Sequence, residues 1–297
     1  MKHQKHSIVF LSLTALSLLM GWRPFGQTIA LAWRNDFYTH LLLIVPLSAF
    51  MILTERPLLG GAESWSIRDG CALILTAAAI GCGASIWRSS LGPDVLLSIQ
   101  TCALVLSWIG FFVLCFGVAV SRQLIFSLVF LFGLVPLPGF AMDFLVAQLQ
   151  IASAWSAHAL FFAFRVPVFQ QGVRLTIPGL TIEVAQECSS IRSSSMLIVA
   201  ALVTAHVLLR TFWRKSIVVA AAVPLSILKN GLRIFIIAML GTRVDPAYLT
   251  GRLHRQGGIV FFAVALGTLL ALLSVLRRGE RPATAQSRLE PRNVPAI

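Results

Sequence analysis

Charged residues are scarce in this 297-residue chain: they make up 12% of it, and only 11 are Asp or Glu. That share is about half the average for soluble proteins. Hydrophobic residues reach 57%, with a mean hydropathy of +0.85. A soluble domain of this length would need far more polar surface, and the apolar residues fall in runs of about 16 to 23, long enough to cross a bilayer of about 30 Å. The composition therefore predicts an integral membrane protein.

Several familiar motifs are also absent from the sequence. There is no H-E-x-x-H or C-x-x-C spacing, no Walker A loop, no G-x-S-x-G elbow and no repeat of fixed period. These absences argue against a metal site and against a cofactor. Five cysteines do not suggest a disulfide framework, because Cys71, Cys82, Cys102 and Cys115 lie in or beside apolar runs, where thiols behave as small hydrophobes.

The apolar runs predict an all-α membrane domain over residues 1–276, with about eight transmembrane helices. A basic, flexible cytoplasmic tail would follow over 277–297. The first run resembles a signal peptide, but no small-x-small site ends it, and we interpret it as a retained helix. The expected spans are 7–22, 38–54, 70–87, 95–117, 123–137, 193–209, 216–240 and 257–276.

Residues 143–164 allow two interpretations, a ninth span or a helix in the membrane interface, because this apolar stretch carries several polar residues. The positive-inside rule favours eight spans. Both termini and the basic loop 210–215 would then face the cytoplasm. The net charge of +13 fits this topology and anionic lipid headgroups better than nucleic acid.

With eight spans, residues 136–193 form an insertion on the outer face. Within it, residues 173–177 and 180–184 alternate partly between apolar and polar and flank Pro178-Gly179, which predicts a short β-hairpin. Cys188 follows the hairpin, and the loop 241–256 lies on the same face.

The polar stretch around Cys188 opens a predicted helix. Unpaired backbone N–H groups at a helix start stabilise a thiolate, the nucleophilic form of cysteine. Arg192 adds positive charge one turn later, whereas Glu187 opposes it. Cys188 is therefore a candidate nucleophile, although a small residue before a serine-rich helix cap is an equally plain interpretation.

Arg233 lies inside an apolar span, where an arginine costs roughly 2.5 to 3.5 kcal/mol by insertion scales. Asn230 is three residues earlier and shares its helix face. Arg233 could stabilise a developing oxyanion or hold a substrate carbonyl. The alternative is that it snorkels to lipid headgroups.

Two histidines lie near the same predicted face. His254 precedes Gly257-Gly258 at the start of the last span and is a candidate general acid and base. The alternative is a solvated loop histidine. His40, at the outer end of the second span, could help to shape the site or could simply be interfacial.

These residues carry a resemblance to the exosortase/archaeosortase family of membrane transpeptidases. That family has a cysteine motif close to V-A-x-x-C-S-G-x-R, then N-x-x-R-I and H-x-x-x-G. The chain reads Val-Ala-Gln-Glu-Cys-Ser-Ser-Ile-Arg over 184–192, Asn-Gly-Leu-Arg-Ile over 230–234 and His-Arg-Gln-Gly-Gly over 254–258, with a Val-Pro-Leu-Pro run at 135–138. The resemblance covers roughly residues 36–265. Ser190 departs from the family, which usually has glycine there.

The resemblance implies a Cys188-Arg233-His254 site supported by Asn230, Arg192, Glu187 and His40. It implies a thiol transpeptidase or protease of the bacterial inner membrane, with its site facing the periplasm. Its partners would be membrane lipids, an acceptor nucleophile and the C-terminal sorting signals of exported proteins (PEP-CTERM-like), often made alongside exopolysaccharide. Such signals comprise a short motif, a transmembrane helix and a basic tail.

Two other classes of function remain open on the sequence. Arg233 would bind an anion in a small-solute transporter, although transporters often show internal repeats and broken helices. In a non-catalytic assembly scaffold, Cys188, Arg233 and His254 need not approach one another.

Overall fold

The structure is a computed structural model that describes residues 2–55, 65–184, 191–249 and 258–280. Within these residues the regular structure is almost entirely helical. The longer helices are α1 (Lys2–Met20), α2 (Trp22–Arg34), α3 (Leu41–Thr54), α5 (Ile67–Ile86), α6 (Pro93–Gln123), α8 (Gly139–Ala163), α9 (Ile191–Leu208), α10 (Phe212–Arg243) and α12 (Gly258–Arg278). The shorter ones are α7 (Ile125–Phe130) and the 3-10 turns η1 (Asp36–Tyr38), η2 (Leu131–Leu134) and η4 (Pro246–Leu249).

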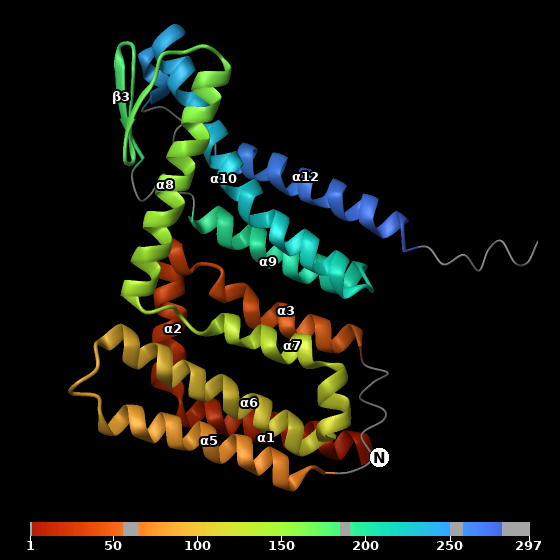
Figure 1. The fold of residues 1–297 in the computed structure, drawn as a ribbon. Coiled ribbons are helices and arrows are strands. Elements are labelled where there is room, and N and C mark those ends of the chain that lie inside the picture. The colour runs from red at the N-terminus through yellow and green to blue at the C-terminus, as the bar shows by residue number, and fades with distance from the viewer. Residues whose placement is uncertain (1, 56–64, 185–190, 250–257, 281–297) are drawn as a thin grey trace, which may run out of the picture.

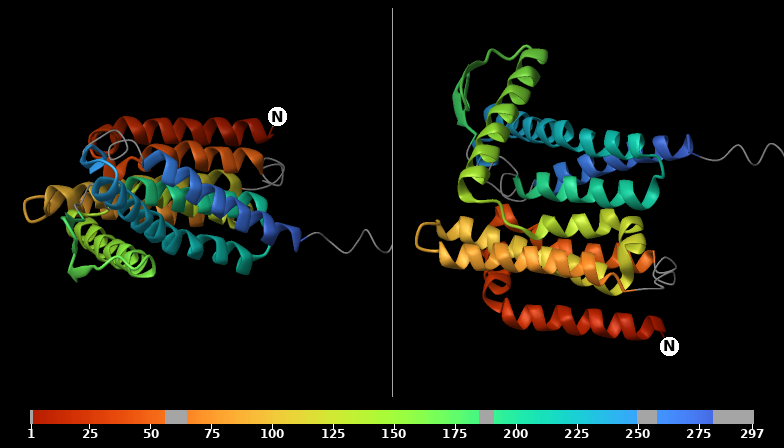
Figure 2. Two further views of the ribbon diagram at one scale, coloured as in Figure 1. Left: turned by 90° about the horizontal axis from the view of Figure 1, so that it is seen from above. Right: turned by 60° about the horizontal axis from the view of Figure 1, so that its bottom comes forward.

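Most helices run back and forth along one common direction (Figure 1). They are α1, α3, α5, α6, α7 with η2, α9, α10 and α12. Both views of Figure 2 show that α1 begins and α12 ends at the same end of this bundle. The three strands lie at the opposite end. We call the first end the terminal end and the second the sheet end.

Each expected span except 123–137 coincides with one of the long helices. Among the described residues, seven helices, α8 included, are long and apolar enough to cross a membrane, and the bent pair of α1 and α2 raises the number to eight. The pair bends by 80° at the place where the first span was expected to end. Gly117, the expected end of the fourth span, is a kink inside α6, with φ 82° and ψ 162°. Glycine is suited to this backbone conformation because it has no Cβ.

α8 covers the ambiguous stretch 143–164. By length and composition it could span a membrane. However, Figure 1 shows it running across the sheet end of the bundle, as α2 also does, rather than along the other helices. That direction favours a helix lying along the membrane surface. The expected span at 123–137 is instead formed by the short apolar helix Ile125–Leu134 and an extended return to residue 138.

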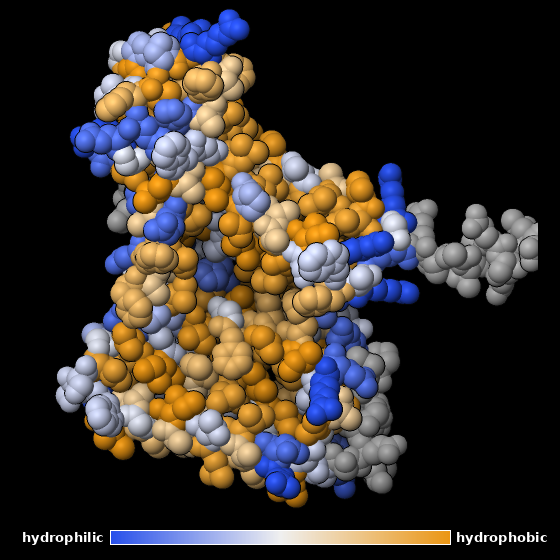
Figure 3. Space-filling view, viewed as in Figure 1, coloured by the Kyte–Doolittle hydropathy of each residue, from blue (hydrophilic) through white to orange (hydrophobic). Residues whose placement is uncertain are grey.

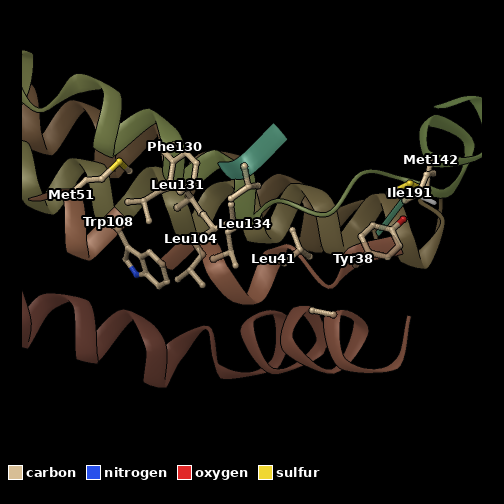
Figure 4. Packing of buried hydrophobic residues seen from close by; sticks show 14 of the residues in the cluster. Tyr38, Leu41, Met51, Leu104, Trp108, Phe130, Leu131, Leu134, Met142 and Ile191 are labelled. Carbon is tan, nitrogen blue, oxygen red and sulfur yellow. The ribbon is translucent and has the colours of Figure 1, made fainter. Parts of the chain in front are cut away.

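Buried apolar side chains join the N-terminal helices to the start of α8 and α9. Figure 4 shows this cluster, which extends from Met51 of α3 and Trp108 of α6, past Leu134 of η2, to Met142 and Ile191. A second cluster joins α8 and α10 to the strands, and a third joins α9, α10 and α12. The first cluster fixes where α8 and α9 begin relative to the N-terminal helices.

The run 135–138, which crosses back to the sheet end, is held by its carbonyl groups. Ser98 Oγ donates to the carbonyl of Pro136 at 2.7 Å, and Tyr38 Oη donates to that of Leu137 at 2.8 Å. The N–H of Gly139 donates to Asp94 Oδ2 at 2.6 Å. Because proline has no N–H, this segment cannot form the regular hydrogen bonds of a helix. Side-chain donors from η1 and α6 satisfy its carbonyl groups instead.

The predicted hairpin is present. Strands β2 (Arg174–Ile177) and β3 (Leu180–Glu183) pair antiparallel around Pro178-Gly179, with Gly179 at φ 81°. The sequence analysis did not foresee a third strand, β1 (Phe169–Gln171), which pairs with β2. The sheet stands beside α8 and α10 at the sheet end (Figure 1).

Candidate functional site

Arg233 lies half-buried in α10, on the wall of a cavity of about 250 Å³. The opposite wall is the strand β3 and the residue after it, Val184. Asn230 also lines this cavity, which confirms that it shares a helix face with Arg233. Leu249 of η4 completes the wall near the C-terminal end of α10. We call this space the Arg233 cavity.

The close approach of α8 to α10 is made at Gly231, between the two polar residues of the cavity. A Cβ at Gly231 would collide with the side chain of Ser156 and would stand 2.9 Å from the backbone nitrogen of Ala157, both on α8. Small residues allow such close helix packing in membranes. The Asn-Gly-x-Arg pattern thus combines two cavity-facing polar groups with the contact that holds α8 in place.

The strand end at Val184 is fixed by two hydrogen bonds. The N–H of Val184 donates to the carbonyl of Val173 at 3.0 Å, within the hairpin. Its carbonyl accepts from Gln150 Nε2 of α8 at 2.7 Å. In the sequence, Gln150 is one of the polar residues that left two interpretations open for 143–164. It therefore has a positioning role that the sequence analysis missed.

Lys229 is a second residue whose position the sequence analysis did not interpret. Its side chain is only 5% exposed, and Nζ donates a short hydrogen bond to Ser193 Oγ in the first turn of α9. A lysine inside an apolar span carries much the same cost as an arginine. This cost could have identified Lys229 as a candidate functional residue from the sequence alone, as it identified Arg233.

Arg192 also lies in the first turn of α9, but it points to another partner. Its Nη1 is 3.0 Å from Asp36 Oδ1 of η1, and both side chains are more than half exposed. His40, four residues after Asp36, immediately precedes α3, makes no side-chain capping hydrogen bond and is half-buried. His40 is not among the residues that line the Arg233 cavity.

Three expected site residues lie outside the described residues: Glu187 and Cys188 in the segment 185–190, and His254 in 250–257. Ser190 lies there too. The described chain stops at Val184 and at Leu249 before these two segments, and both of these residues line the Arg233 cavity. It resumes at Ile191, two residues before Ser193, the partner of Lys229.

Within the described part of the chain, no group of three or more His, Cys, Asp or Glu side chains gathers closely enough to hold a metal ion. The Arg233 cavity presents the guanidinium of Arg233, the amide of Asn230 and a mostly apolar wall; the one carboxylate in its lining, Glu183, forms an ion pair with Arg174 at 3.0 Å. Such a lining can bind a polarised carbonyl or an anion in partly apolar surroundings.

Comparison with protein families gives one match. A family model described as transmembrane exosortase matches residues 32–271, which is most of the chain. No curated protein and no solved structure matches.

Proposed function

Because the chain belongs to the transmembrane exosortase family, we propose that it is a membrane cysteine transpeptidase or protease that acts at the Arg233 cavity. Family membership supports a membrane peptidase or transpeptidase in general. The proposal adds the residues: Cys188 as nucleophile, Arg233 as oxyanion donor, and His254 as general acid and base.

One observation carries the assignment. The segments that hold Cys188 and His254 both leave the described structure from the wall of the cavity that Arg233 lines, at Val184 and at Leu249. Cys188 is four residues beyond Val184, and His254 is five beyond Leu249. Extended chain spans at most about 3.6 Å per residue. The short connections therefore keep both residues close enough to the cavity for their side chains to enter it.

The proposed reaction proceeds in two halves through a thioester. The thiolate of Cys188 attacks the scissile carbonyl carbon, and the guanidinium of Arg233 donates hydrogen bonds to the oxyanion. When the C–N bond breaks, the imidazolium of His254 gives its proton to the departing amine. An acceptor nucleophile then loses a proton to His254, attacks the thioester carbon and releases the thiolate.

Asn230 and Lys229 support this chemistry from α10. Asn230 is 1% exposed and lines the cavity one turn before Arg233. Lys229 anchors the start of α9 through Ser193. Arg192 ties the same first turn to η1 through Asp36. These contacts hold the helix that begins three residues after Cys188, so they would fix where the nucleophile approaches the cavity.

The proposed substrate is a C-terminal sorting signal of an exported protein: a short PEP-CTERM-like motif, a transmembrane helix and a basic tail. A substrate helix in the bilayer holds its scissile bond at a fixed height, so the membrane supplies part of the positioning. The sheet end, with the cavity, would face the periplasm. The terminal end, which carries Arg210, Arg277 and Arg278, would face the cytoplasm.

The test is co-expression with a tagged candidate substrate, followed by measurement of its cleavage. Cys188→Ala, Arg233→Ala and His254→Ala should each abolish cleavage. Matched controls are Cys82→Ala, an exposed thiol on α5, and Arg243→Ala, an exposed arginine in the last turn of α10. Cleavage that survives in the Cys188 variant would end the thiol mechanism.

A further inference from the structure

A second cavity, with charged walls, lies at the terminal end, away from the Arg233 cavity. It has a volume of about 600 Å³ and lies where α9 ends beside the end of α12. Its lining residues are Val207, Leu208, Arg210, Ser274, Arg277, Arg278 and Glu280. Three of the seven are arginines, and nothing in the proposed reaction uses them. We call this space the arginine pocket.

A reciprocal clamp builds the rim of the arginine pocket. Glu280 accepts hydrogen bonds from the backbone N–H groups of Arg210 and Thr211, at 2.9 and 2.8 Å. In return, Arg214 donates to the carbonyls of Leu276 and Gly279, at 2.8 and 3.1 Å. The α9–α10 turn is therefore fixed against the end of α12, and the arginines are held at one place.

The clamp also leaves the pocket positively charged. Its single carboxylate, Glu280, is engaged by backbone N–H groups, and Arg214 caps carbonyls at the negative end of α12. Within the described residues, the side chains of Arg210, Arg277 and Arg278 make no hydrogen bond or ion pair. Guanidinium groups match the geometry of phosphate oxygens, which they bind in pairs of hydrogen bonds.

Apolar surface adjoins these charges. Val207 is 47% exposed and Val275 is 63% exposed, both within one turn of a helix end. Figure 3 shows hydrophilic side chains gathered at the end of α12 and at the α9–α10 turn, directly beside hydrophobic surface along the helices. A ligand that matches both parts has an anionic head and acyl chains.

We propose that the arginine pocket binds the phosphate headgroup of an anionic phospholipid in the leaflet at the terminal end. Basic pockets between transmembrane helices are known sites for such headgroups. Free phosphate shares the anionic chemistry but gains nothing from the adjoining apolar surface. This proposal is independent of the proposed peptidase activity, because it concerns the opposite end of the bundle.

The test uses the full-length protein in detergent, titrated with phosphatidylglycerol, phosphatidylcholine or inorganic phosphate. Apparent melting temperature and native mass spectrometry report binding. Phosphatidylglycerol should raise the melting temperature and remain bound, and the other two should not. The double variant Arg277→Gln with Arg278→Gln should weaken phosphatidylglycerol binding roughly tenfold, which is the loss of about one charge-assisted hydrogen bond.

The matched control is Arg34→Gln with Arg88→Gln, which removes two arginines at the sheet end: the last residue of α2 and a residue just after α5. It should leave lipid binding unchanged. Arg210→Gln is a second pocket variant, should the double variant fail to fold. Equal binding of the two lipids, an equal loss in the control, or an equal response to inorganic phosphate would each overturn the proposal.

Discussion

The two longest helices, α6 with 31 residues and α10 with 32, differ in where their charged residues lie. In α6 the charged residues are Asp94 in the first turn and Arg122 in the last. α10 carries Lys229 and Arg233 well inside an apolar sequence. A charge inside a span costs free energy that packing alone does not return. The contrast therefore separates a helix that builds the bundle from a helix that serves a site.

The polar residues of the two helices follow the same division. In α6, Thr101 forms a hydrogen bond with Thr28 at 2.9 Å, and Ser98 donates to the carbonyl of Pro136, so these two polar groups close structural contacts within the bundle. In α10, Asn230 and Arg233 line the Arg233 cavity. Polar and charged groups on a cavity wall inside a membrane protein indicate a ligand or substrate site.

The largest expected effect comes from the cavity-facing charge of α10. Arg233→Met should lower the rate of substrate cleavage about 10²–10³-fold, the usual loss when one oxyanion donor is removed. Folded yield should stay the same, because an intramembrane charge has been removed. Arg233→Lys should recover little activity, because lysine lacks the planar fork of donors. Cleavage assays on purified variants measure both effects.

Arg243→Met, on the same helix but exposed in its last turn, is the control and should keep full activity. If Arg233→Met retains activity but folds poorly, α10 would be structural like α6, and the distinction between the two helices would fail.

The converse change places a charge in the structural helix. Val105 of α6 is 0% exposed. Val105→Lys should destabilise the protein by about 3 kcal/mol or more, because no partner awaits the ammonium. The measurement is the thermal unfolding midpoint in detergent, together with folded yield. Val244→Lys, at an exposed valine just after α10, should change neither; tolerance of Val105→Lys would show that α6 accepts internal charge as α10 does.

Much of this division could be predicted from the sequence. All the expected spans except 123–137 followed from the lengths of apolar runs, and the hairpin followed from alternation around Pro178-Gly179. Arg233 stood out because a charge inside a span is costly. The direction of α8 could not be predicted, because its length and composition equal those of a span. Its place is decided by distant packing, such as that of Met142 against the N-terminal helices and Gly231 against Ser156.

The missed features have similar reasons. β1 reads Phe-Gln-Gln, which shows no useful alternation, and it becomes a strand because β2 offers it partners. Lys229 was visible, but its partner Ser193 is 36 residues away in sequence. The catalytic assignments of Cys188 and His254 stay predictions, since both residues lie outside the described part of the chain.

Lys229 offers a sharper test of α10, because its charge is buried against a neighbouring helix. Lys229→Met should leave the melting temperature unchanged or raise it, since removing a buried charge is often neutral or stabilising. Cleavage should nevertheless fall about tenfold, because the start of α9 loses its anchor. Ser193→Ala should have a similar effect on cleavage, and the double variant should lose little more.

Additive losses in that double variant would show that the two residues act separately. A loss of stability that parallels the loss of cleavage would make Lys229 a structural residue, comparable with the buried polar groups of α6.

The crosswise helix α8 supports the cavity opposite α10 through a single side-chain amide. Gln150→Leu should lower cleavage about fivefold, because a neutral hydrogen bond to the carbonyl of Val184 contributes about 1 kcal/mol. Gln148→Leu is the matched control: the same change, two residues earlier, at an exposed position. Cleavage assays of both variants at one substrate concentration show whether the hydrogen bond from Gln150 contributes to activity. Equal activity in the two variants would mean that the strand end does not need α8.

The smallest expected effect concerns the carboxylates that hold the ends of these helices. Asp94 of α6 accepts the N–H of Gly139, and Glu280 accepts the N–H groups of Arg210 and Thr211 just before α10. Those two N–H groups lower the pKa of Glu280 from its ordinary 4.5 to about 2.

A lowered pKa means that the stabilisation is complete above about pH 4.5 and is lost as the pH falls towards 2. The slope of unfolding free energy against pH is proportional to the number of protons taken up on unfolding. Glu280→Gln should therefore make the decline over this range less steep, by an amount that corresponds to at most about one proton per molecule. Thermal unfolding at stepped pH measures the slope, with Asp143→Asn, an exposed carboxylate on α8, as the control. A Glu280→Gln profile identical to the wild type would show that the α9–α10 turn is held by Arg214 alone, and that α10, unlike α6, needs no carboxylate at its end.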